Sequence, residues 1–201
     1  MRLVLAGLAT VVLVLAGGAL ADSTNGNKLQ CFSGSTDGGG FNGTCTLTSS
    51  GAVLNTVDGD ADPNNNYAGV YVQNTNLDGK LVSHVNMLAF SYSGTSAAGG
   101  SPRLSIPIDE NGDGTTEAYA FVDTLGCNDG SAETGTLDAI NDATCSVAYG
   151  STVYASWAAF AAANPTFRIA SDSVAFVIID QPGVFTITNV QLGRGPAKPA
   201  K

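Results

Sequence analysis

Hydrophobic and polar residues alternate along much of the chain after residue 43. A period of two predicts β-strands, because successive side chains of a strand point to opposite faces of the sheet. Stretches rich in Gly, Asn and Asp separate these segments and are typical of turns. The segments expected to form strands are 44–54, 67–72, 88–92, 104–108, 118–122, 174–179 and 185–192. Many short strands with turns between them predict an all-β fold, a mainly antiparallel β-sandwich.

Three of these segments carry finer signals. Residues 174–179 are apolar throughout, which predicts a strand buried on both faces. Pro107 lacks a backbone N–H and therefore predicts an edge strand or a bulge at 104–108. In 185–192 the apolar positions shift from 185 and 187 to 190 and 192, and this change of phase predicts a β-bulge.

One segment, about 154–164, has the period of a helix. Its apolar residues would share one face: Tyr154, Trp157, Phe160 and Ala161. We expect one short α-helix of about three turns here, capped by Ser151 or Thr152 and ended by Pro165. Trp157 is the single tryptophan of the chain. It either anchors the helix to the sheet or, as the alternative, stacks on a sugar ring.

The two ends of the chain differ from its middle. Residues 1–21 are typical of a secretory signal peptide, with Arg2, a long apolar run and an Ala-x-Ala site at 19–21. The alternative for this segment is an uncleaved membrane anchor. Residues 194–201 combine Gly, Pro and Ala with three positive charges, which predicts a disordered tail. We therefore expect a secreted, extracellular protein whose β-sandwich domain spans 22–193.

Export changes how the four cysteines are interpreted. In an oxidising compartment, four cysteines indicate two disulfides more often than a metal site, and no C-x-x-C pair is present. Three pairings are open. We favour the local one, in which each bridge closes a stretch rich in Gly, Asn and Asp, and each loop would add roughly 3 kcal/mol of stability. The favoured bridges are Cys31–Cys45 and Cys127–Cys145.

Charge excludes some classes of function. Eight Lys and Arg stand against 17 Asp and Glu, which gives a net charge of −9. A chain this poor in basic residues is not expected to bind nucleic acid. We also expect no membrane partner after cleavage of the signal peptide, because the sequence has no second long apolar segment.

The sequence offers little support for catalysis. A Ser-His-Asp triad would need His84, the single histidine, and no G-x-S-x-G motif accompanies it. A glycosidase needs two placed carboxylates, whereas the glutamates of the expected domain (Glu110, Glu117 and Glu133) lie in expected turns or loops. We expect no catalytic residues.

The segment 109–114 reads D-x-N-x-D-G and joins two expected strands. Oxygen side chains at alternate positions can wrap a hard cation such as Ca²⁺. The candidate ligands are Asp109, Asn111, Asp113 and, at the ninth position, Glu117. The twelfth position is Ala120, so the segment is not an EF-hand. The alternative is a solvated hairpin turn, and the Asp-rich stretch 58–62 is a second calcium candidate with the same alternative.

Tyr67 and Tyr71 share one face of an expected strand, opposite Val70 and Val72. If the valine face is in the core, both rings point outward, where aromatic side chains can stack on sugars. The alternative places the tyrosine face inside the sandwich. The sequence thus offers Tyr67 and Tyr71 as candidate ligand residues for a glycan.

The order of segments 85–92, 99–106 and 185–192 resembles the jelly-roll sandwiches of carbohydrate-binding modules and galactose-binding-like domains. An Asn189-Val190 step before Gly193 is part of this resemblance. It implies a jelly-roll fold and carries over no ligand residue. We expect a secreted, noncatalytic protein that binds carbohydrate, with structural calcium. The alternatives are a structural or adhesive cell-surface protein that binds other proteins, and a small secreted hydrolase.

Overall fold

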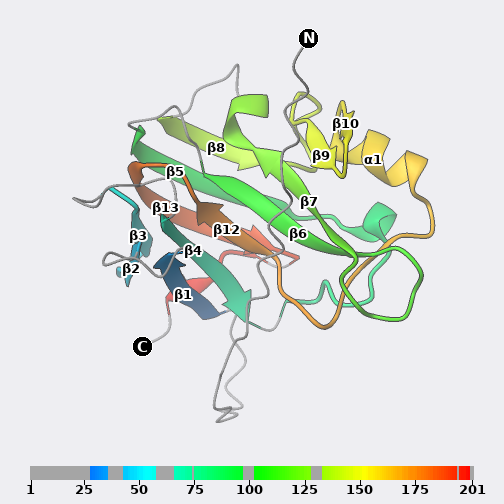
Figure 1. Ribbon diagram of the computed structural model, residues 1–201, viewed down its shortest axis with the longest axis horizontal. Coiled ribbons are helices and arrows are strands. Elements are labelled where there is room, and N and C mark those ends of the chain that lie inside the picture. The colour runs from blue at the N-terminus through cyan, green and yellow to red at the C-terminus, as the bar shows by residue number, and fades with distance from the viewer. Residues whose placement is uncertain are drawn as a thin grey trace.

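The computed structural model describes residues 28–35, 43–57, 66–73, 75–96, 102–127, 133–193 and 195–199. The expected signal peptide and the second acidic stretch, 58–62, lie outside these residues. The described chain is mostly β, with two packed sheets and one α-helix (Figure 1). The expected all-β sandwich is therefore confirmed at the level of two sheets and one helix.

The larger sheet has the strand order β10-β9-β7-β6-β12-β4-β1-β14, and β11 pairs with β6. Its strands are β1 (Lys28–Ser35), β4 (Asn66–Gln73), β6 (Arg103–Asp109), β7 (Ala118–Asp123), β9 (Val147–Tyr149), β10 (Thr152–Tyr154), β11 (Arg168–Ile169), β12 (Phe176–Ile179) and β14 (Lys198–Pro199). The smaller sheet has the order β2-β3-β13-β5-β8. Its strands are β2 (Thr44–Leu47), β3 (Gly51–Asn55), β5 (Leu88–Ser96), β8 (Thr134–Asp138) and β13 (Gly183–Leu192).

The core lies between the inner faces of the two sheets. The core is built from alternate positions along each strand, since every second side chain of a strand points inward. The larger sheet contributes residues such as Val70, Leu104 and Ile106, and the smaller sheet contributes Phe90 and Phe185, all nearly fully buried. In β12, Val177 and Ile179 are buried, but the alternate residues are only half-buried. The expectation that this strand is buried on both faces is therefore wrong, because its outer face borders solvent.

The expected bulge in β13 is confirmed. Its register with β5 shifts between Thr188 and Gln191, and Asn189 has a φ of 51°. The edge strand expected from Pro107 is wrong, since β6 lies between β7 and β12. Proline is tolerated there because β12 pairs with β6 only as far as Ser105, so the missing N–H of Pro107 faces no β12 partner.

The helix is shorter than expected. Helix α1 (Trp157–Ala163) begins after Ser156, whose side chain accepts a hydrogen bond from the Ala159 N–H. The expected start is wrong because Tyr154 pairs with β9 in strand β10. Trp157 is 3% exposed and donates a hydrogen bond from Nε1 to the Val82 carbonyl, in the 3₁₀-helix η2 (Val82–His84). Trp157 thus anchors the helix to the domain, and the sugar-stacking alternative for it is wrong.

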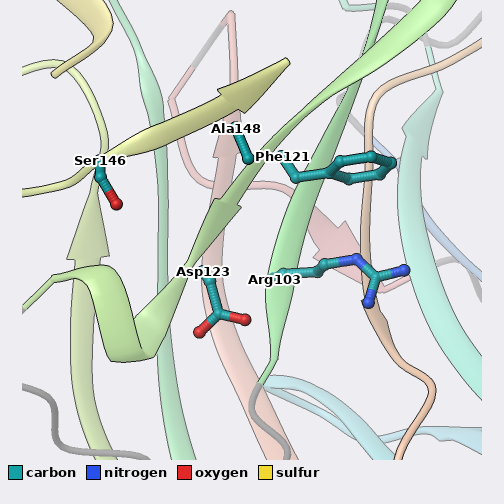
Figure 2. A pocket seen from close by; sticks show the side chains of 5 residues that line it. All are labelled: Arg103, Phe121, Asp123, Ser146 and Ala148. Atoms are coloured by element: carbon teal, nitrogen blue, oxygen red, sulfur yellow. The ribbon is translucent and has the colours of Figure 1, made fainter. Parts of the chain in front are cut away.

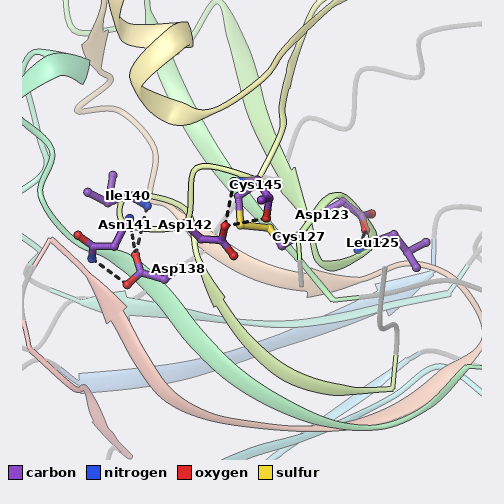
Figure 3. The surroundings of a disulfide bond; sticks show 9 residues. Asp123, Leu125, Cys127, Asp138, Ile140, Asn141, Asp142 and Cys145 are labelled. Atoms are coloured by element: carbon purple, nitrogen blue, oxygen red, sulfur yellow. Dashed lines mark hydrogen bonds between the residues drawn. A yellow bond between two sulfur atoms is a disulfide. The ribbon is translucent and has the colours of Figure 1, made fainter. Parts of the chain in front are cut away.

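Both expected disulfides are confirmed. Cys31–Cys45 joins β1 to β2 and therefore links the larger sheet to the smaller one. Cys127–Cys145 lies between two short turns, near Asp123 and Asp142 (Figure 3). In Figure 1, β1, β2 and β3 lie at one end of the sandwich, and β9, β10 and α1 lie at the other.

Residues 195–199, the described part of the segment 194–201, do not form the expected disordered tail. Lys198 and Pro199 pair in parallel with Lys28 and Leu29, and the Ala197 N–H donates to the Val190 carbonyl. Backbone pairing of this kind does not need an apolar side-chain pattern, which explains why composition alone did not predict it. Within the ranges given above, no helix is long and apolar enough to cross a membrane.

Candidate functional site

Tyr67 and Tyr71 lie on the outer face of the larger sheet. Their strand neighbours Ala68, Val70 and Val72 are buried in the core, so the two tyrosines point the opposite way. Both are half-buried. Of the two placements that the sequence left open, the structure therefore has the outward one, and the tyrosine face does not lie inside the sandwich.

The structure adds four rings to these two tyrosines. Phe32 lies 6.4 Å from Tyr67 and 6.4 Å from Tyr71, measured between ring centroids, and 5.4 Å from Phe176. Such spacings are typical of packed aromatic pairs. We call the whole set the aromatic stripe; it crosses strands β1, β4, β12 and β7 and consists of Phe32, Tyr67, Tyr71, Phe176, Tyr119 and Phe121.

From Phe176 on β12, the stripe continues along the same face of the sheet to β7. Phe176 lies 5.5 Å from Tyr119, and Tyr119 lies 6.4 Å from Phe121 in a stacked arrangement. The Tyr119 hydroxyl shares a hydrogen bond of 2.6 Å with Ser173 Oγ. All six rings are half-buried, so each shows some of its surface to solvent while its neighbours hold it in place.

Two glycines make room for the rings of the stripe. Gly69 is the register partner of Phe32, and Gly34 is the register partner of Tyr67. A Cβ atom at position 69 would overlap the Phe32 ring, and one at position 34 would overlap the Tyr67 ring. The rings therefore lie across the neighbouring strand, in space that any other residue would fill.

Arg103 lies at the end of the stripe beside Phe121. Its guanidinium carbon is 5.1 Å from the Phe121 ring centroid, within the range of a cation–π contact. The same guanidinium forms a bidentate ion pair with Asp180, with Nη1 2.6 Å from Oδ1 and Nη2 2.5 Å from Oδ2. Because Asp180 offsets its charge, Arg103 presents a fixed polar group and not a free cation.

A hollow of about 410 Å³ adjoins this end of the stripe, lined by Arg103, Phe121, Asp123, Ser146 and Ala148. Figure 2 shows the side chains of Arg103 and Phe121 lying side by side, with the Asp123 carboxylate nearby. The Asp123 side chain accepts a hydrogen bond of 2.7 Å from the Leu125 N–H, which fixes its orientation. Ser146 follows directly after Cys145, so the Cys127–Cys145 disulfide helps to position this wall of the hollow.

The second predicted site, loop 109–117, joins β6 to β7. Asp109 is 1% exposed. Its carboxylate accepts hydrogen bonds from the backbone N–H groups of Asn111, Gly112 and Gly114, at 3.1, 2.6 and 2.9 Å. Contacts with Asp172 also hold the loop, since the Thr116 hydroxyl donates to that carboxylate at 2.6 Å. The loop is thus folded around the Asp109 side chain.

The structure brings the four predicted calcium ligands together. Three carboxylate oxygens lie within 4.8 Å of one another, one each from Asp109, Asp113 and Glu117. Asn111 donates from its amide to Glu117 at 2.7 Å and accepts from the Asp113 N–H at 2.9 Å. Hydrogen bonds from the Thr115 hydroxyl and N–H lower the pKa of Asp113, so this carboxylate stays ionised. An oxygen-only cluster of this kind suits a hard cation, and exposed acidic groups also gather without one.

Sequence reasoning missed most of the stripe. The four rings that were missed lie on the outer face of the larger sheet and belong to Phe32, Phe176, Tyr119 and Phe121. Their contacts with one another depend on strand order and register, which are long-range properties. The sequence of a single strand therefore held no signal that would have joined these rings to Tyr67 and Tyr71.

No protein-family model, curated protein or solved structure matches this chain.

Proposed function

We propose that this chain is a secreted, noncatalytic carbohydrate-binding protein, and that the aromatic stripe is its binding surface. The observation that carries the proposal is the stripe itself, a continuous series of partly exposed rings on the outer face of a sheet. Isolated apolar residues on a surface need no explanation, whereas a continuous patch indicates a binding site.

The chemistry of the patch favours a sugar as the ligand. A pyranose ring has apolar C–H faces that pack on aromatic rings, and hydroxyl groups around its edge that need polar partners. The stripe supplies the rings. Arg103, Asp123 and Ser146 supply donors and acceptors in the hollow at its end.

Two features of the whole chain support the wider proposal of a secreted jelly roll. The chain crosses repeatedly between the two sheets, from β1 to β2 and β3, back to β4, and on to β5, as jelly-roll chains do. Both disulfides are formed, and disulfides persist mainly in oxidising compartments.

The proposal is tested by retention on insoluble polysaccharides and by a glycan array. We expect the wild-type chain to bind at least one glycan, and Tyr71→Ala to lower its affinity roughly tenfold, as loss of a central aromatic contact does. Tyr154→Ala is the matched control, because Tyr154 is also half-buried but packs on Phe160, away from the stripe.

Two results would contradict the proposal. One is wild-type protein that no glycan retains; co-purification with an envelope protein through the same surface would then favour the adhesive alternative. The other is a glycan affinity that Tyr71→Ala and Tyr154→Ala change equally, since the aromatic stripe would then not be the binding surface.

A further inference from the structure

Two polar atoms of strand β6 lack a hydrogen-bond partner within the described residues of the chain. They are Ser105 Oγ and Arg103 Nε, and both atoms are buried. Ser105 as a whole is 0% exposed. Native proteins pair most buried polar groups, because an unpaired one costs stability, so each exception calls for an explanation.

Both atoms lie near the Phe121 end of the aromatic stripe, on the strand between β7 and β12. Ser105 is the register partner of Phe121 on one side and of Phe176 on the other. Arg103 is two residues earlier on the same face of β6. The unpaired atoms thus occupy the polar floor of the surface whose rings form the proposed glycan site.

Two rings of the stripe close over this floor. Tyr119 belongs to β7 and Phe176 to β12, and β6 runs between these two strands. Two strand spacings amount to roughly 9.6 Å, yet the two ring centroids are only 5.5 Å apart. The rings therefore lean toward each other across β6, which accounts for the complete burial of Ser105.

The guanidinium of Arg103 is held in place by its ion pair with Asp180. Its Nη1 and Nη2 atoms both bind Asp180, and its Nε–H faces no protein acceptor among the described residues. A hydroxyl such as Ser105 Oγ can both donate and accept. Together, the two groups offer one donor and one donor–acceptor to a ligand hydroxyl.

We propose that Ser105 Oγ and Arg103 Nε form a polar subsite for a sugar hydroxyl, opened when the Tyr119 and Phe176 rings separate. This inference rests on the proposed function. Side-chain rotation is enough to move apart a pair of rings that touch across a strand. The unpaired serine then has a role that alanine could not fill, although alanine would suit the buried position better in the absence of ligand.

The test compares stability and binding in the same variants of the full chain. Ser105→Ala removes one unpaired hydroxyl, so we expect an equal or higher melting temperature. In calorimetric titration with a soluble oligosaccharide of the polymer that retains the wild type, we expect the variant to bind about threefold to tenfold more weakly, as loss of one hydrogen bond does.

Thr124→Val is the matched control. The Thr124 hydroxyl, in the 3₁₀-helix η3 (Thr124–Gly126), is also buried and has no hydrogen-bond partner among the described residues, and it lies outside the aromatic stripe. We expect this variant to keep the wild-type affinity. A Ser105→Ala affinity equal to that of the wild type overturns the subsite and leaves the glycan function standing. An absence of wild-type binding to any glycan overturns both proposals.

Discussion

Among single residues, Tyr149 connects the acidic loop with the helical end of the domain. Its hydroxyl donates a hydrogen bond to Glu110 Oε1, in loop 109–117. Its ring packs on Phe160 of α1 at 5.4 Å and on Phe167 at 5.7 Å. Burial is the main cause that raises the pKa of Tyr149 well above its ordinary value of 10.0, and the Glu110 carboxylate raises it further. The folded protein thus holds this hydroxyl in its neutral form.

This shift predicts a loss of stability in alkali. Below pH 10 Tyr149 is neutral in both the folded and the unfolded chain, so its contribution is fully present. Above pH 10 the unfolded chain releases the proton while the folded chain keeps it, and the free energy of unfolding falls. We expect urea midpoints to decrease above pH 10, and Tyr149→Phe to decrease less steeply. Equal slopes for the two proteins would show that other groups cause the loss.

Among the elements, loop 109–117 shows how far a local motif determines structure. The alternation of Asp, Asn and Asp with glycine predicted a tight loop between two strands, and the structure has one between β6 and β7. Gly112 and Gly114 have φ values of 86° and 88°, which favour glycine over other residues. Calcium binding by this loop stays a prediction.

We expect calcium to raise the melting temperature of the chain. For a weak extracellular site with a dissociation constant of roughly 1 mM, about 10 mM calcium would add roughly 1.4 kcal/mol to the free energy of unfolding. Asp113→Asn should remove the effect while preserving the turn, because asparagine can still accept from the Thr115 N–H.

Asp142→Asn is the control for this experiment. Asp142 accepts hydrogen bonds from the N–H and hydroxyl of Thr144, as Asp113 does from Thr115. These bonds likewise lower the pKa of Asp142. The response to calcium should survive in this variant. If calcium leaves the melting temperature of the wild type unchanged, the loop is a plain hairpin turn.

The strands predicted correctly from the sequence are those whose own residues show a clear strand pattern. Strands β4, β6 and β7 alternate clearly and appear within a few residues of the expected positions. Strands β1 and β8 were missed, because KLQCFSGS and TGTLD contain few β-branched apolar residues and many small ones. Tyr154, the last residue of β10, was predicted to lie in the helix, because its spacing fits a helical period and only pairing with β9 places it in a strand.

The residues of the aromatic stripe likewise differ in whether a single strand or the complete sheet determines their placement. The pattern of a single strand was enough to place Tyr67 and Tyr71 on one face, opposite Val70 and Val72, but not to decide which face was the outer one. Phe32 and Phe176 could not be joined to them, since β1 and β12 become neighbours of β4 only when the sheet is complete. Functional surfaces that cross strands therefore need the fold before they can be recognised.

For the whole molecule, charge limits the class of glycan. Residues 22–193 contain 17 acidic and four basic residues, a net charge of −13. One of those bases, Arg103, is paired with Asp180. An anionic polysaccharide would meet a repulsive field over the whole domain and little positive charge at the stripe.

We therefore expect retention of uncharged polysaccharides and none of an acidic one such as alginate. Binding should also be insensitive to salt, because ring stacking is not screened. Pull-downs at low salt and at about 1 M salt, where the Debye length is roughly 3 Å, check this. An affinity that falls steeply with salt would indicate an electrostatic surface elsewhere on the molecule.

The Cys31–Cys45 bridge has a mechanical consequence. Strand β1, which carries Phe32, is held along most of its length by hydrogen bonds to β4, while β14 covers only Lys28 and Leu29 on its other side. A strand near a sheet edge separates from its neighbour when a pulling force breaks their backbone hydrogen bonds one after another. The disulfide to β2 stops this separation at Cys31 and transmits the pulling force to the smaller sheet. A polymer pulling on the Phe32 end of the stripe would therefore strain both layers of the sandwich together.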